Sequence, residues 1–212
     1  GEAEEAILEI SEAYRRLKAE YKSGKFKKEE LLLEFARIEG VYIPSLYNVE
    51  YDDRGNILSF RPKATGIPAK ISKRFVRDLD KSYFPTNWLV PYIQIVHDRI
   101  TLEVMRGCPN RCRFCQARSQ YYPLRCKQPK IVLELAEQIY KNSGYEEISL
   151  LGLSVSDYPK LEVLLKSLVC GFKSKGISVS LPSIKPKTML GEMTDLIATI
   201  KKTGLTFAPE AA

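Results

Sequence analysis

From residue 100 onward the sequence alternates short apolar runs with longer amphipathic runs, and this alternation limits the possible folds more than any other feature. The longer runs predict a helix that opens at Pro129, a second helix capped by Asp157, and a third across 189–200. The short runs predict strands at 100–105, 147–151, 177–181 and 205–208. Strands and helices that alternate in this way form right-handed βαβ units, so the sequence predicts an α/β fold with a parallel sheet.

Residues 1–92 are organised differently and are expected to form a linker region that precedes a second domain of residues 93–212. Apolar residues at helical spacing predict one helix over 3–22 and another over 28–38, which can pack together as a helical hairpin. Two strand-like runs around a turn-rich segment then predict a β-hairpin. The hairpin strands are expected at 46–51 and 57–61. This first part carries no catalytic constellation of its own.

Cys108, Cys112 and Cys115 stand in one short segment with C-x3-C-x2-C spacing. Such spacing lets three thiolates bind one metal centre, and a 4Fe–4S cluster held by three cysteines keeps one iron open to another ligand. The chain has five cysteines, an odd number, and shows neither an export signal nor an apolar run long enough to cross a membrane. Metal binding is therefore a better interpretation than disulfide bonding, and a cytoplasmic location is expected.

Cys126, Cys170 and His97 carry weaker signals. Cys126 lies eleven residues beyond Cys115 and could be a fourth metal ligand, although a buried free thiol is the commoner state. Cys170 stands in a predicted helix, where a packing role is expected. His97 is the only histidine of the chain, and a structural or hydrogen-bonding role is favoured over metal ligation.

The net charge of +7 is concentrated around the cysteine segment. Between Asp98 and Lys130 there are eight Lys or Arg residues, opposed only by Asp98 and Glu103, which leaves this window at +6. The ordinary interpretation is a solvated surface loop. The functional interpretation is a positive rim that attracts an anionic ligand, an acidic electron donor or a nucleic acid. Few aromatic residues accompany these charges, so nucleic-acid binding is only one of these options.

Small and hydroxyl-bearing residues follow the predicted strands. In parallel α/β folds, ligands bind at the carboxyl ends of the strands, and the cysteine segment follows the first predicted strand directly. Gly152, Leu153 and Ser154 follow the second strand, residues 180–183 the third, and residues 208–210 the fourth. Each of these segments alone could be an ordinary turn or helix cap. Their shared position at one edge predicts a site for a polar ligand.

The cysteine segment, with Phe114 directly before its last cysteine, resembles the signature of the radical S-adenosylmethionine enzymes. The segment Arg106-Gly107-Cys108-Pro109 is similar to the corresponding segment in the subgroup whose core follows a cobalamin-binding domain. Leu181-Pro182-Ser183 and Phe207-Ala208-Pro209-Glu210 resemble strings of a poorly characterised branch of that subgroup, and residues 1–92 resemble its linker. The resemblance implies a partial (βα) barrel of the TIM-like type, of which four strands are expected here. The chain is accordingly expected to be an internal fragment that binds its cluster but is inactive alone.

The resemblance also implies a role for individual residues. Cys108, Cys112 and Cys115 would ligate a 4Fe–4S cluster, whose open iron would bind S-adenosylmethionine. Phe114 would lie beside the adenine. Gly152, Leu153 and Ser154 stand where the family usually has Gly-Gly-Glu, so the usual acidic partner of the cofactor amino group is absent here. Ser180 and Glu210 fall at positions that face the cofactor in related enzymes.

The implied activity is reductive cleavage of S-adenosylmethionine to a 5′-deoxyadenosyl radical, or radical methyl transfer with cobalamin, driven by a reductant such as flavodoxin or ferredoxin. Two alternatives stay open. One is a tRNA-modifying enzyme similar to the methylthiotransferases, although residues 1–107 lack the further cysteines that such enzymes carry. The other is a non-enzymatic zinc-binding interaction module, in which Cys126 completes a four-cysteine site.

Overall fold

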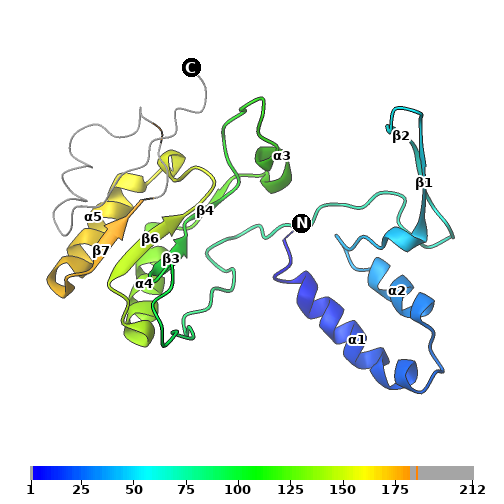
Figure 1. Cartoon of the computed structure of the whole chain (residues 1–212), viewed down its shortest axis with the longest axis horizontal. Helices are drawn as coiled ribbons and strands as arrows, with labels where there is room; N and C mark the ends of the chain where they lie inside the picture. The colour runs from blue at the N-terminus through cyan, green and yellow to red at the C-terminus, as the bar shows by residue number, and fades with distance from the viewer. Residues whose placement is uncertain (1, 182–184, 186–212) are drawn as a thin grey trace. The chain divides into compact units, whose positions relative to one another are not determined.

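The computed structural model describes residues 2–181 and residue 185 (Figure 1). Contacts within the chain divide it after Val76 into two compact units, earlier than the boundary expected at residue 92. The residues just after Val76 group with the second unit because Leu79 is buried and Phe84 and Trp88 pack against that unit's core. The predicted helix over 189–200 and the predicted strand over 205–208 lie outside the described residues.

The first unit contains two helices and a two-stranded hairpin. Helices α1 (Ala6–Lys22) and α2 (Lys28–Ala36) contact each other, at the positions where the sequence predicts two helices. The short 3-10 helix η1 (Pro44–Leu46) precedes strands β1 (Tyr47–Tyr51) and β2 (Ile57–Pro62), which pair antiparallel. Much of the apolar stripe on α1 stays exposed within this unit, as Ile7 shows with 52% of its surface accessible.

In the described part of the second unit, the core is a three-stranded parallel sheet in the order β3–β6–β7. Its strands are β3 (Ile100–Glu103), β6 (Glu147–Leu151) and β7 (Ser178–Ser180). Helices α4 (Pro129–Ser143) and α5 (Leu161–Phe172) connect these strands and contact each other, so they cover the same face of the sheet (Figure 1). This arrangement confirms the predicted α/β fold with a parallel sheet.

The two faces of this sheet differ in polarity. Side chains alternate along a strand, and the helix-covered face carries buried apolar residues such as Ile100, Leu102 and Ile148. The opposite face carries polar residues in register: Thr101 pairs with Ser149, which pairs in turn with Ser180. Parallel sheets are usually apolar on both faces because helices cover both. Here the second face is suited to water or to a polar ligand.

Helix α4 begins and ends where the sequence predicts, at Pro129 and before Gly144, whose φ of 70° is left-handed. The predicted cap of the next helix is wrong. Asp157 lies in the 3-10 helix η2 (Val155–Asp157), and α5 starts only at Leu161, with Lys160 in the cap position. The reason is Pro159, which disfavours helical backbone in the residue before it. Tyr158 is accordingly extended, with φ −68° and ψ 119°.

The strand predicted over 100–105 is divided into two. Strand β3 ends at Glu103, and β4 (Met105–Arg106) pairs antiparallel with β5 (Arg125–Cys126) instead of continuing the sheet. Val104 lies at the junction, where its N–H donates to the Leu151 carbonyl and its carbonyl accepts from the Lys127 N–H, both at 2.9 Å. The segment between β4 and β5 contains the three clustered cysteines and the short helix α3 (Ala117–Tyr121). None of the helices in the described part is both long and apolar enough to cross a membrane.

Candidate metal and cofactor site

The cysteine loop, defined here as residues 107–116, leaves the sheet region at Gly107. Gly107 has a φ of 91° and is enclosed by the backbone of the returning segment. A Cβ at this position would lie 2.8 Å from the carbonyl oxygens of Tyr121 and Pro123 and 2.9 Å from the Leu124 Cα. Only glycine fits both this conformation and this space. The two ends of the segment are therefore held in close contact where it joins β4 and β5.

The three cysteines of the loop are all free thiols. Cys108 and Cys112 are partly exposed and Cys115 is exposed, and the Cys115 N–H donates to the Cys112 carbonyl at 3.1 Å. Within the described residues, no three His, Cys, Asp or Glu side chains are gathered closely enough to hold a metal ion. As a donor set, three accessible free thiols on one loop fit a group that is bound by thiolates, such as an iron–sulfur cluster.

A polar cluster lies beside the cysteine loop at the carboxyl end of β6. Ser154, a predicted cofactor residue, donates from Oγ to Asp157 Oδ2 at 2.6 Å. Asn110 from the loop and Lys185 from the segment after β7 also donate to that oxygen, each at 2.6 Å. Burial alone would raise the pKa of the Asp157 carboxyl, but the hydrogen bonds from Lys185, Ser154 and Asn110 together lower it. Asp157 therefore stays ionised.

Sequence reasoning missed Asn110, Asp157 and Lys185 as site residues. The sequence analysis assigns no role to Asn110, which lies between two cysteines, and expects Asp157 to cap a helix. Pro159, two residues after Asp157, is the signal that argues against this cap. Lys185 lies just beyond residues 180–183, the stretch expected to contribute after the third strand.

The other predicted cofactor residues of this edge have different surroundings. A Cβ on Gly152 would lie 2.6 Å from Met105 Cγ, so glycine here lets β6 approach β4 closely. Leu153 is 48% exposed and Phe114 is 69% exposed, so both side chains are accessible. Ser180 donates to Glu147 Oε1 at 2.7 Å on the polar face of the sheet. Glu210 lies outside the described residues.

The remaining candidates have ordinary roles in the described structure. His97 lies with its Nδ1 3.1 Å from an Arg99 guanidinium nitrogen, as expected of a hydrogen-bonding residue. Cys126 packs partly buried against the core, and burial raises the pKa of its thiol. Cys170 is exposed on α5, so its predicted packing role is wrong. The reason is its position on the solvent side of α5, next to the buried residues Leu168 and Val169.

The basic window from residue 98 to residue 130 is only partly a solvated surface. Arg99 pairs with Glu147 at 3.4 Å and Arg106 with Glu103 at 2.8 Å, both facing the polar side of the sheet. Lys127 is 1% exposed. Arg111 and Arg113 of the cysteine loop are exposed. The accessible positive charge of the loop thus lies directly beside the three cysteines.

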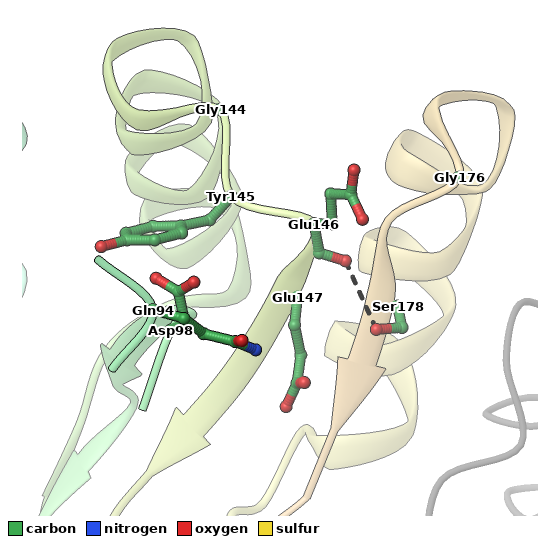
Figure 2. A pocket seen from close by; sticks show the side chains of 8 residues that line it. All are labelled: Gln94, Asp98, Gly144, Tyr145, Glu146, Glu147, Gly176 and Ser178. Atoms are coloured by element: carbon green, nitrogen blue, oxygen red, sulfur yellow. Dashed lines mark hydrogen bonds between the residues drawn. The ribbon is translucent and has the colours of Figure 1, made fainter. Parts of the chain in front are cut away.

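A separate polar pocket of about 400 Å³ lies at the opposite end of the sheet, where β6 and β7 begin (Figure 2). The Ser178 hydroxyl closes one side by donating to the Glu146 carbonyl at 3.4 Å. The lining residues are Gln94, Asp98, Gly144, Tyr145, Glu146, Glu147, Gly176 and Ser178. None of the predicted cluster or cofactor residues belongs to this lining, so the pocket is distinct from the candidate site.

Comparisons with known proteins agree with the geometry of the second unit. Residues 102–209 match the family model described as the Radical SAM superfamily. The chain is 38% identical over 111 residues to the uncharacterized protein MJ0966 of Methanocaldococcus jannaschii, an overlap of 52% of this chain and 23% of that protein. It is 33% identical over 131 residues to the ribosomal protein uS12 methylthiotransferase RimO of Desulfotalea psychrophila, or 56% of this chain and 29% of RimO. The chain therefore spans about a quarter of the length of these relatives.

Proposed function

The chain belongs to the radical SAM superfamily, and from this premise we propose that it binds a 4Fe–4S cluster through Cys108, Cys112 and Cys115 and supplies part of a core that cleaves S-adenosylmethionine reductively in the complete protein. The observation that carries the proposal is the position of the cysteine loop, which projects from the carboxyl end of β3 beside the residues that follow β6. Ligands of parallel α/β folds bind at this edge. Three thiolates leave one iron of such a cluster without a protein ligand.

Residues of the neighbouring strand ends are suited to hold S-adenosylmethionine next to the cluster. The backbone at Gly152 and Leu153 is accessible at the end of β6, and Phe114 offers an exposed ring and backbone in the loop itself. Ser180 carries a hydroxyl group at the end of β7, and Glu210 remains a prediction from the sequence. When bound, the cluster supplies the electron that cleaves the sulfonium cofactor into methionine and a 5′-deoxyadenosyl radical.

The polar face of the sheet supports a partial barrel in the complete protein. Apart from Leu151, the residues opposite the helices are mostly polar and suit a polar lumen better than an apolar layer; they include Thr101, Glu103, Glu147, Ser149 and Ser180. In this proposal the substrate enters that lumen and contacts these side chains. Their role is to orient the substrate and to exclude water from the radical.

The test is anaerobic reconstitution of the chain with iron and sulfide, followed by electron paramagnetic resonance of the reduced protein. We expect the signal of a reduced 4Fe–4S cluster, and a change in that signal when S-adenosylmethionine is added, because one iron is free to bind it. Formation of 5′-deoxyadenosine under strong reductant would extend the result to cleavage. A colourless protein that binds a single zinc ion, and releases it when Cys126 is replaced, would instead establish the zinc-binding module.

Similarity to RimO favours a second candidate, a methylthiotransferase-like activity. The overlap covers 29% of RimO, so it concerns the radical core and not the whole relative. Methylthio transfer needs a sulfur source in addition to the radical. Iron and sulfide analysis of the complete protein separates the two candidates, because a second cluster would about double the iron bound per chain. Use of cobalamin remains a prediction from the resemblance, and its test is a shift in the absorption spectrum when cobalamin is added to the complete protein.

A further inference from the structure

One oxygen of Asp157 joins three segments that are far apart in the sequence. Asp157 Oδ2 accepts hydrogen bonds from Asn110 Nδ2 of the cysteine loop, from Ser154 Oγ after β6, and from Lys185 Nζ after β7, each at 2.6 Å. Charged hydrogen bonds of this length are among the strong ones in proteins. The carboxylate therefore connects the loop to the ends of both neighbouring strands.

Asp157 is held more firmly than the loop that it contacts. It is the last residue of η2, whose first residue Val155 is buried, and the next residue Tyr158 is buried as well. The Tyr158 hydroxyl donates to the Lys127 carbonyl at 2.5 Å. Asn110, in contrast, lies in a stretch without regular secondary structure. Asp157 is thus the better anchored partner of this hydrogen bond.

Both ends of the Asn110 carboxamide are fixed. Its Oδ1 accepts from Lys185 Nζ at 2.7 Å while its Nδ2 donates to Asp157, so the amide has one preferred orientation. In this orientation Nδ2 also lies 3.3 Å from Cys108 Sγ, within hydrogen-bonding range of sulfur. A hydrogen bond to a ligating thiolate disperses its negative charge and raises the reduction potential of the cluster that it holds.

We propose that Asp157 is a positioning residue of the cysteine loop: it holds Asn110 so that the loop stays against the strand ends and one N–H group points at the Cys108 sulfur. The tethering of the loop does not depend on the proposed function, whereas the effect of Asn110 on a cluster rests on it. Lys185 compensates the charge of Asp157 at 2.6 Å, so the carboxylate is close to the loop without adding uncompensated negative charge to it.

The first test uses the metal-free protein. Asp157→Asn keeps the size of the side chain but removes its negative charge and one of its two acceptor oxygens, so the hydrogen bonds from the three donors lose their charge assistance. We expect iodoacetamide to alkylate Cys108 several-fold faster in this variant than in the unaltered chain, because the loop is held less tightly. Cys170, which is exposed on α5, is the internal reference and should react at an unchanged rate. Asp98→Asn, at the opposite end of the sheet, is the matched control.

The second test uses the reconstituted protein and a redox titration followed by electron paramagnetic resonance. Asn110→Ala should lower the midpoint potential, because the Cys108 sulfur loses its N–H donor. Asp157→Asn also leaves the charge of Lys185 uncompensated, which by itself raises the potential, so the readout for this variant is iron. Both variants should lower the iron retained after gel filtration, and the double variant should retain no less than Asn110→Ala alone, because Asp157 acts through Asn110. Additive losses of iron, or iron retention in Asp157→Asn equal to that in Asp98→Asn, would overturn the inference.

The two tests separate this inference from the proposed function. If the unaltered chain takes up no cluster, the proposed function fails, while the alkylation rates still decide whether Asp157 tethers the loop. If the unaltered chain takes up its cluster, but Asp157→Asn changes neither the alkylation rate of Cys108 nor the properties of the reconstituted protein, the proposed function stands and the inference fails. Circular dichroism of every variant establishes that the sheet and helices are intact, so that a slower or faster thiol reaction reports on the loop.

Discussion

The five cysteines of this chain differ in whether they are placed to bind one common cluster. Cys108, Cys112 and Cys115 lie on one loop, whereas Cys126 packs against the core and Cys170 lies exposed on α5. Replacing any of the loop cysteines with Ala should abolish a stable cluster, because two thiolates are too few to hold it. Iron and acid-labile sulfide per chain after gel filtration are the measurements. Cys126→Ser and Cys170→Ser should retain iron near that of the unaltered chain; loss of iron in the Cys126 variant would show that the ligand set is different.

Lys127 is a buried charge with two hydrogen-bond acceptors. Its Nζ donates to the Leu79 carbonyl and, at 2.8 Å, to Ser82 Oγ. Lys127→Met would remove two hydrogen bonds from a charged donor, although the Leu79 carbonyl would still accept from Ser82 Oγ at 2.7 Å. Loss of these bonds should lower the free energy of unfolding by about 1–3 kcal/mol at neutral pH. Chemical denaturation of both proteins measures this difference.

The same lysine predicts a pH dependence with a definite sign. Burial lowers the pKa of Lys127 below its ordinary value of 10.5, more than nearby carboxylates such as Glu103 raise it. Between the lowered pKa and 10.5 the unfolded chain therefore binds more protons than the folded chain, and this group's contribution to stability rises with pH. The difference in unfolding free energy between the unaltered chain and Lys127→Met should grow as the pH approaches 10.5. A constant difference across that range would contradict the shift.

At the scale of single residues, the sequence predicts sites whose residues are close together in the chain and misses sites whose residues come together only in the fold. The three loop cysteines are recognisable because their spacing alone defines a ligand set. The cluster around Asp157 is not, because its partners Asn110 and Lys185 are separated from it by 47 and 28 positions. Only the parallel arrangement of β3, β6 and β7 brings them together.

At the scale of elements, the loop depends on how β4 meets β5. The close contact between Gly107 and the backbone of residues 121–124 leaves no room for a Cβ. Gly107→Ala should therefore displace the cysteine loop and destabilise the protein by about 1–3 kcal/mol, with a matching loss of bound iron. Gly171→Ala is the control, because a Cβ there would meet Leu133 Cδ1 at an ordinary 3.6 Å. Equal melting temperatures and equal iron contents in the two variants would show that the close contact at Gly107 does not hold the cysteine loop in place.

The elements that the sequence predicts well are those whose ends carry their own signals. Helix α4 has Pro129 at one end and Gly144 at the other, and the β-hairpin has a turn-rich tip in which Asp52 accepts from the Asn56 N–H at 2.7 Å. The division of the first strand at Val104 has no such signal, because apolar residues continue through Met105. There the tertiary partners Leu151 and Lys127 decide the backbone path.

At the scale of the whole molecule, the exposed arginines of the cysteine loop suit an acidic redox partner. Arg111→Glu combined with Arg113→Glu should slow reduction of the cluster by flavodoxin by roughly tenfold at low salt, because electrostatic steering is reversed. Reduction by dithionite should change far less, since a small reductant needs no docking. Stopped-flow absorbance measures both rates. Arg15→Glu with Lys18→Glu on α1 makes the same change in net charge and should leave both rates unaltered; equal slowing in this control would indicate a general charge effect.

In the described part of the second unit, none of the fully buried core residues is a cysteine, so folding of this part does not depend on binding a metal. Proteins whose ligands form their core are unfolded until metal arrives. Here the sheet and its two helices can assemble on apolar burial alone, and the thiols remain at the surface on a loop with closed ends. If the three thiols bind a cluster as proposed, iron could be delivered to the folded protein and lost from it again without loss of the fold. The metal-free protein would then persist as a folded acceptor of the cluster.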